Sequence, residues 1–196
     1  MENEFYVIGI GASSGGLVAL TEFFDHVSAD LPAAFVITTH LLREHRSILN
    51  ELIAKHTTLP VVRVEQDVNI EAGKVYVLIE NQELTLQGHT LRTKLRKQQA
   101  LNSSVDLFFD SLAMSFKEKA IGIILSGAGK DGLHGALEIA KNGGYMMVQE
   151  PGSAQATGMP DSIIGGDHPK IQGSPKELAK ALNKKLGLMQ PKNNNY

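Results

Sequence analysis

Phe5-Tyr-Val-Ile-Gly-Ile10 is an apolar run that leads into the glycine-rich turn Gly11-Ala-Ser-Ser-Gly-Gly16. A short continuous apolar run that ends in glycines is typical of a strand buried on both faces. Residues 17–27 follow with apolar side chains at the spacing of one helix face. A buried strand, a sharp turn and a helix together form the repeating unit of an α/β fold.

The same alternation continues along the rest of the chain. Further strands are expected at 33–39, 61–64, 74–79, 120–125 and 145–148, with a hairpin at 83–86 and 89–95. Helices are expected at 44–55, 105–116, from 131 or 132 to 140, and 175–186. We therefore predict one α/β domain with a mostly parallel sheet over residues 1–189, and a disordered tail at 190–196.

Composition excludes several classes of protein. The 196 residues are 42% hydrophobic and 20% charged, as in an ordinary globular domain. The net charge of −2 argues against general nucleic-acid binding, and the absence of cysteine excludes disulfides and thiolate chemistry. No apolar run approaches the ~20 residues that span a bilayer, and the start is acidic and polar, unlike a signal peptide. We expect a cytoplasmic protein without membrane insertion, cofactor or bound metal.

The first turn fits one of three known glycine-rich templates. A dinucleotide fingerprint counted from Gly9 would need glycine where Ser14 stands, and a phosphate-binding P-loop would need lysine after Gly16. The nucleophile template G-x-S-x-G is matched by Gly11-Ala-Ser-Ser-Gly15 between a strand and a helix. The alternative is a turn that only caps the helix or binds phosphate. Ser13 is therefore a candidate nucleophile.

A nucleophilic serine needs a base and an orienting carboxylate. His40 directly follows the strand at 33–39, and Asp131 follows the strand at 120–125 through a glycine-rich loop. The carboxyl ends of parallel strands meet at one edge of the sheet, so these side chains are expected near Ser13. The chain order of α/β-hydrolases would select His168 as base, but the strands that precede the nucleophile in that fold are missing here.

Several ordered motifs resemble the catalytic domain of the chemotaxis protein-glutamate methylesterases (CheB type). The resemblance extends over residues 5 to about 186. Besides the turn at 11–16, it rests on four short motifs, namely Thr38-Thr-His40, Ser104-Val-Asp106, Gly127-Ala-Gly-Lys-Asp-Gly132 and Gly158-Met-Pro160. It implies a doubly wound, three-layer αβα fold of the Rossmann-like kind. It also implies Ser13 as nucleophile, His40 as general base and Asp131 as the carboxylate that orients His40.

The activity implied by the resemblance is hydrolysis of glutamate γ-methyl esters on the cytoplasmic helices of chemoreceptors, with deamidation of glutamine by some members. Backbone amides near Ser14, Ala128 and Gly129 are candidates for the oxyanion hole. Met159, in a loop, is expected either to line the substrate cleft or to fill a gap in the packing. The family's usual receiver domain is not expected, because four residues precede the first strand.

Two other functions remain open from the sequence. Many family members carry methionine where this chain has Ala128, and the His-Arg-Pro that often precedes the Ser-Val-Asp motif is replaced by Ala100-Leu-Asn-Ser103. These changes motivate the hypothesis of a degenerate member that binds a partner without turnover. The second is a nucleotide-dependent oxidoreductase, because the turn Gly11-Ala-Ser-Ser-Gly15 resembles the start of short-chain dehydrogenases. Those enzymes need a Tyr-x-x-x-Lys pair, and no tyrosine of this chain has a lysine four residues later, so this function is disfavoured.

Overall fold

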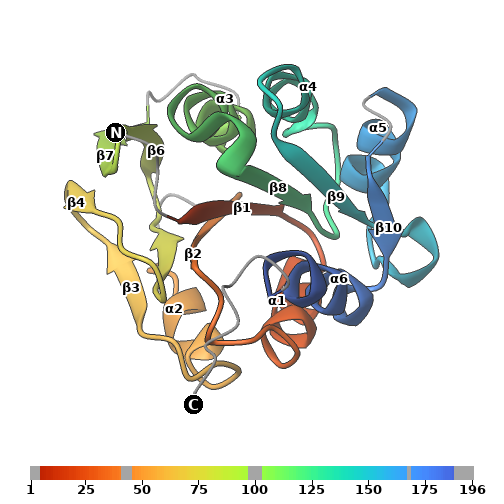
Figure 1. The fold of residues 1–196 in the computed structure, drawn as a ribbon, viewed down its shortest axis with the longest axis horizontal. Helices are drawn as coiled ribbons and strands as arrows, with labels where there is room; N and C mark the ends of the chain where they lie inside the picture. The colour runs from red at the N-terminus through yellow and green to blue at the C-terminus, as the bar shows by residue number, and fades with distance from the viewer. Residues whose placement is uncertain (1–4, 41–45, 97–102, 167–168, 188–196) are drawn as a thin grey trace, which may run out of the picture.

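A seven-stranded parallel sheet forms the centre of the molecule (Figure 1). The computed structural model describes residues 5–40, 46–96, 103–166 and 169–187. The strand order is β10-β9-β8-β1-β2-β5-β3, and every neighbouring pair is parallel. The strands are β1 (Tyr6–Ala12), β2 (Ala33–Thr39), β3 (Val61–Val64), β5 (Val75–Leu78), β8 (Ala120–Ile124), β9 (Tyr145–Gln149) and β10 (Ile171–Gly173).

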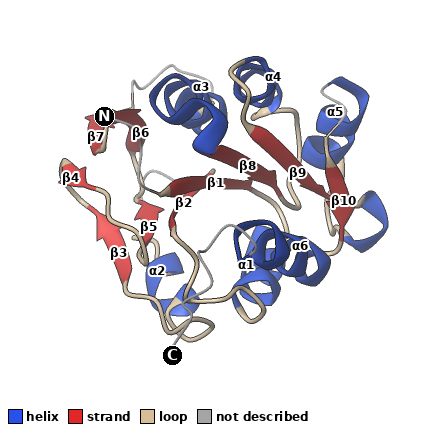
Figure 2. Cartoon of the chain, viewed as in Figure 1, coloured by secondary structure: helices blue, strands red, loops and turns tan. Residues whose placement is uncertain are grey.

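Helices cover both faces of this sheet, so the fold has three layers (Figure 2). One face carries α1 (Gly16–Phe24), α2 (Leu49–Ile53) and α6 (Pro175–Gly187). The other face carries α3 (Ser104–Phe116), α4 (Leu133–Lys141) and α5 (Gly158–Gly166). A small antiparallel sheet packs against α3 through β6, and it consists of β4 (Val68–Asn69), β6 (Gln82–Gln87) and β7 (Thr90–Leu95). The predicted αβα architecture is confirmed.

Two hydrophobic cores hold the layers together, one on each face of the sheet. Phe108, Phe109 and Phe116 of α3 are buried in the first. Phe23 and Phe24 of α1 are buried in the second, where the ring of Phe24 meets Phe35 of β2 edge to face. Strands buried on both faces explain the continuous apolar runs in the sequence.

The order of the strands fixes where a site can form. From β1 the chain proceeds to β2 on one side and later returns to place β8 on the other side. Open α/β sheets bind their ligands at such a reversal, beyond the carboxyl ends of the strands. Ser13 follows β1, His40 follows β2, and the loop after β8 leads to Asp131. The topology therefore brings these three segments to one edge of the sheet.

The structure corrects several expected elements. Gly158–Gly166 is a helix rather than a loop. Pro160 is compatible with this helix, because it lies in the first turn, where a backbone N–H has no partner within the helix. The helix expected at 44–55 is shorter, covering Leu49–Ile53, and residues 41–45 lie outside the described part. The first helix ends at Phe24 rather than residue 27. The short strands β4 and β10 were not expected.

Candidate active site

The turn after β1 holds Ser13 at the edge of the sheet through backbone hydrogen bonds. The Ser13 N–H donates to the Ser126 carbonyl at 3.0 Å, and the Gly16 N–H donates to the Ser13 carbonyl at 2.8 Å. The Ser126 hydroxyl donates to the Ser14 carbonyl at 2.8 Å. Gly15 has φ of +74°, in the left-handed region that favours glycine. The sharp turn is therefore built from this sequence and tied to the neighbouring loop.

His40 lies beside Ser13. Its Nδ1 is 3.2 Å from the Ser13 Oγ, and its Nε2 is 2.7 Å from Asp131 Oδ2. The side chain of His40 is 22% exposed and that of Asp131 is 7% exposed. The structure therefore joins Ser13, His40 and Asp131 in one hydrogen-bonded chain, although they are distant in sequence.

Asp131 is held by three donors. Its Oδ2 accepts hydrogen bonds from the His40 ring and from the Val105 N–H at 3.0 Å, and its Oδ1 accepts one from the Asp106 N–H at 3.0 Å. Both backbone donors lie in the first turn of α3. A helix N-terminus supplies N–H donors to an acceptor, so these bonds hold the Asp131 side chain in place beside His40. Ser103 stands at the N-cap position of α3 but makes no side-chain cap, and the Asp131 carboxylate accepts the helix N–H groups instead.

This geometry fixes the tautomer that a general base requires. A carboxylate accepts only, so the His40 Nε2 carries the proton and donates it to Asp131. The Nδ1 is then the acceptor, and the Ser13 hydroxyl donates to it. The arrangement can take the hydroxyl proton as Ser13 attacks a carbonyl and stabilise the resulting imidazolium.

Some of the backbone N–H groups around Ser13 are already engaged in hydrogen bonds. The Ser13 N–H and the Gly127 N–H are already bonded to Ser126 and Ala156. Within the described residues, no hydrogen bond is recorded for the N–H groups of Ser14, Ala128 and Gly129, the three sequence candidates. A Cβ on Gly127 would lie 3.2 Å from the Ser13 Cβ, so the loop that carries Ala128 adjoins the serine.

Of the two roles expected for Met159, the structure places it in the packing of the core and not on the cleft. Its side chain is fully buried, and its sulfur lies where a Cβ on Gly127 would have to go. Because Met159 belongs to α5 and not to a loop, it points into the core. Its side chain packs against the loop of Gly127 from the side of the core.

Two cavities meet at His40. One of about 250 Å³ lies toward α1 and α2, and its walls include Ser13, Leu17, Leu20, Ile48 and Leu52. The other, of about 580 Å³, lies toward α3 and α4 and is bordered by Ala128, Gly129, Lys130, Asp131 and Leu137. Apolar side chains dominate the first cavity, so it suits an aliphatic group attached to a carbonyl near Ser13.

Three other histidines take no part in the hydrogen bonds that join Ser13, His40 and Asp131. His26, His56 and His134 bond the Glu22 carbonyl, Asp25 and Asp110 respectively. His168, the alternative base, and the residues 100–102 lie outside the described part, as does the tail at 190–196. Across the described ranges, no group of three His, Asp or Glu side chains could hold a metal ion, and no helix is long and apolar enough to cross a bilayer.

Sequence reasoning gave no role to two residues that shape the site. Ser126 links the turns after β1 and β8, since its hydroxyl bonds Ser14 and its amide bonds the Gln149 side chain at 2.8 Å. Asp106 appeared only as part of a family motif, but its backbone N–H holds Asp131. The role of Ser126 could have been suspected from its position next to a glycine-rich loop. The role of Asp106 could not be predicted from the sequence, because it depends on the packing of α3 against α4.

Comparisons with known proteins identify the family of this chain. The family model described as CheB methylesterase matches residues 8–182. A protein-glutamate methylesterase/protein-glutamine glutaminase of Thiobacillus denitrificans is 35% identical over 164 residues, which cover 81% of this chain and 46% of that protein. The corresponding protein 3 of Burkholderia orbicola is 33% identical over 156 residues, which cover 79% of this chain and 46% of that protein.

The chain thus spans about half the length of these relatives. The crystal structure of the Thermotoga maritima CheB methylesterase catalytic domain superposes with a TM-score of 0.84 and 24% identity, covering 93% of this chain and all of that domain, which supports the fold. On the family match over most of its length, the chain belongs to the CheB methylesterase family.

Proposed function

We propose that this protein is a serine hydrolase that removes methyl groups from glutamate γ-methyl esters of a protein substrate. The observation that carries the proposal is the chain of hydrogen bonds from Ser13 Oγ to His40 Nδ1 and from His40 Nε2 to Asp131 Oδ2. Family membership supports the same reaction, because relatives carry the name protein-glutamate methylesterase. The three polar groups together supply what acyl transfer requires.

In the first half of the reaction, Ser13 Oγ attacks the ester carbonyl while His40 Nδ1 takes the hydroxyl proton. The carbonyl oxygen becomes negative, and the N–H groups of Ser14 and of Ala128 or Gly129 stabilise it. His40 then returns its proton to the departing methoxy oxygen, so methanol leaves and a glutamyl ester of Ser13 remains.

In the second half, water attacks the glutamyl–Ser13 ester with His40 as base. The Ser13 oxygen leaves with the proton from His40, which restores the free enzyme and releases glutamate. Asp131 stays ionised throughout and stabilises the imidazolium in both halves. A glutamine side chain passes through the same tetrahedral intermediate with ammonia as leaving group, so we extend the proposal to glutamine deamidation, as in the names of the relatives.

The substrate we propose is a methylated helix of a chemoreceptor, with the reaction in the cytoplasm and residues 1–189 as the catalytic domain. The cavity of about 250 Å³ beside Ser13 receives apolar parts of the substrate. Family membership supports this assignment of partner and compartment.

Methanol release from a methylated receptor fragment tests the proposal. Wild-type protein should release methanol, and Ser13→Ala should reduce the release to background while its circular dichroism spectrum stays native. Binding of the fragment by wild-type protein without methanol release would favour the degenerate binding module instead. Equal release by wild-type protein and Ser13→Ala would refute Ser13 as nucleophile.

A further inference from the structure

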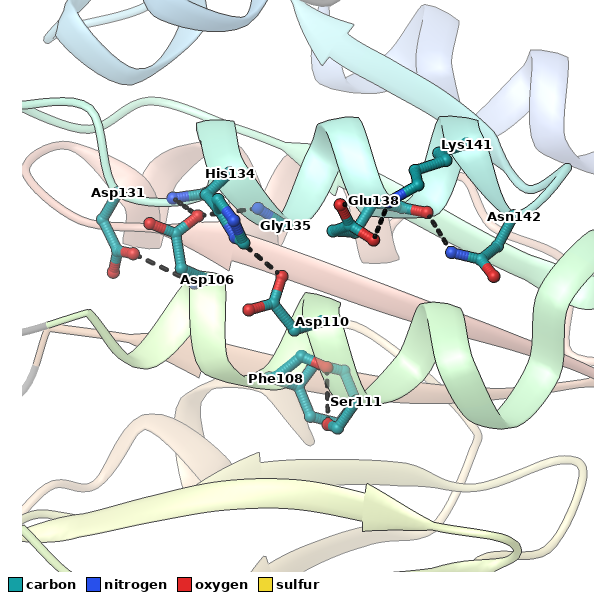
Figure 3. A network of polar contacts seen from close by, with 11 residues as sticks. Asp106, Phe108, Asp110, Ser111, Asp131, His134, Gly135, Glu138, Lys141 and Asn142 are labelled. Carbon is teal, nitrogen blue, oxygen red and sulfur yellow. Dashed lines mark hydrogen bonds and ion pairs between the residues drawn. The ribbon is translucent and has the colours of Figure 1, made fainter.

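The helices α3 and α4 begin side by side (Figure 3). The first turn of each helix is capped by an aspartate that lies at the start of the other helix. Asp131, just before α4, accepts the Val105 and Asp106 N–H groups at the start of α3. Asp106, in the first turn of α3, accepts the Gly132 and Gly135 N–H groups at the start of α4. The two aspartates therefore cap the two helices reciprocally.

The contacts of Asp106 are short and converge on one atom. Its Oδ1 accepts both the Gly132 N–H and the Gly135 N–H at 2.9 Å. Gly132, at the N-terminal end of α4, has φ of +101° and provides no side chain that could cap the helix itself. Asp106 is thus the side chain that fixes the backbone immediately after Asp131.

We propose that Asp106 is a positioning residue of the hydrolase site, which holds the Asp131 carboxylate in the orientation that faces His40 Nε2. This inference rests on the proposed function for its kinetic part. Asp106 acts twice on Asp131: its N–H binds Oδ1 directly, and its carboxylate anchors the next residue, Gly132. Asp106 borders the larger cavity, but both of these contacts are to the chain's own residues 131 and 132, so the role assigned to it is positioning and not catalysis.

The structure explains why the anchor matters. The loop from β8 to α4 contains Gly127, Gly129 and Gly132, and the last two have positive φ. Such a backbone has little conformational preference of its own. Without the Asp106 carboxylate, the Gly132 and Gly135 amides lose their acceptor and the start of α4 is free to shift. A displacement of about 1 Å at a catalytic group costs on the order of 100-fold in rate.

The acceptor position, rather than the charge, is the feature that this role requires. Charged or titratable groups near Asp106 are Asp131, His40, Lys130 and His134 around the larger cavity, and Asp110 one turn later on α3. Burial raises the pKa of the Asp106 carboxyl, the Gly135 amide opposes this, and the charge of Asp131 raises it further. A second negative charge beside Asp131 is unfavourable, which makes asparagine the conservative replacement.

Three variants at this position separate the possibilities. Asp106→Asn keeps an oxygen where Oδ1 lies, Asp106→Glu keeps the charge but moves it by one methylene, and Asp106→Ala removes both. Asp110→Asn is the matched control, because Asp110 is on the same helix and bonds a histidine that the mechanism does not use. Each protein is assayed for kcat/KM with a methylated receptor fragment and by proton NMR for the His40 Nε2–H resonance.

We expect Asp106→Asn and Asp110→Asn to keep kcat/KM within about threefold of wild type, and Asp106→Ala to lose about 10- to 100-fold. The low-field His40 Nε2–H resonance should persist in Asp106→Asn and be lost in Asp106→Ala. Should the alanine variant fail to fold, the order of the other two decides: Asn more active than Glu supports positioning, and Glu more active than Asn overturns it. A folded alanine variant with native kinetics and resonance also overturns it.

The NMR signal requires no turnover. A wild-type protein without esterase activity would contradict the proposed function, but the response of the His40 resonance to the Asp106 variants would still test the positioning. The two failures are therefore distinguishable.

Discussion

Asp131→Asn is the substitution whose consequence the structure defines most closely. The carboxylate of Asp131 accepts donors at both oxygens, from His40 and Val105 at Oδ2 and from Asp106 at Oδ1. An asparagine has one acceptor oxygen and one NH₂ group, which only donates. If its oxygen faces Asp106, its NH₂ group faces the Val105 N–H and the ring of His40.

In this orientation the imidazole must change its tautomer, whereas the reverse orientation keeps the tautomer and turns the NH₂ group toward the Asp106 N–H. With an NH₂ group opposite Nε2, the favourable state has Nε2 unprotonated and the proton on Nδ1, which is 3.2 Å from the Ser13 Oγ. That nitrogen can no longer accept the hydroxyl proton. The expected loss in kcat is on the order of 10⁴-fold, equivalent to about 5 kcal/mol of transition-state stabilisation.

The variant should nevertheless fold. It loses one charge-assisted hydrogen bond at the N-terminus of α3, and the loss of such a cap lowers the free energy of unfolding by about 1–2 kcal/mol. The assay compares kcat for methanol release and urea unfolding for wild type, Asp131→Asn and the control Asp110→Asn. A kcat for Asp131→Asn within tenfold of wild type would refute the argument from tautomers.

Three further outcomes follow from the structure. Gly127→Ala places a methyl group against the Met159 sulfur and beside Ser13, so we expect a loss of about 1–3 kcal/mol in urea unfolding and reduced activity; an unchanged midpoint would contradict the packing. The cavity beside Ser13, about 250 Å³, exceeds the roughly 150 Å³ that accommodates benzene in an apolar site, so ethyl and propyl esters should be hydrolysed as well as methyl esters. Leu52→Phe should narrow this cavity and selectively slow the longer esters, and an equal effect on all three would argue against the cavity as a subsite. Burial raises the pKa of the folded Asp106 carboxyl above its ordinary 3.8, so its contribution to stability is complete below pH 3.8 and is lost as the pH rises through the folded pKa. As the pH rises from 3.8 through the folded pKa, urea unfolding should therefore show wild type losing stability relative to Asp106→Asn. A difference in stability that does not change with pH would contradict this expectation.

The strands of the main sheet were the most predictable part of the fold. The strands Ala33–Thr39 and Val61–Val64 have the expected bounds, because continuous apolar runs between polar turns carry a strong local signal. Helix α5 was missed, since Gly158, Pro160 and the glycines near its end suggest a turn unless the tertiary contacts of Met159 are known. The three residues of β10 form a strand only because they pair with β9.

The site was predictable as far as the topology determines it. Ser13, His40 and Asp131 follow strands whose ends meet, and the structure joins them by hydrogen bonds. The orientation of the imidazole and the exchange of caps between Asp106 and Asp131 depend on how α3 packs against α4, which no local pattern encodes. The buried position of Met159 depends on tertiary packing in the same way.

Covalent labelling of Ser13 tests directly whether its hydroxyl is the activated nucleophile. The intact chain is incubated with a fluorophosphonate, digested, and mapped by mass spectrometry, with His40→Ala as the second sample. We expect a single phosphonyl group on the peptide that contains Ser13 in wild-type protein, and none in His40→Ala, because Nδ1 activates the hydroxyl. An unmodified Ser13 in wild-type protein, or equal labelling of both proteins, would contradict it.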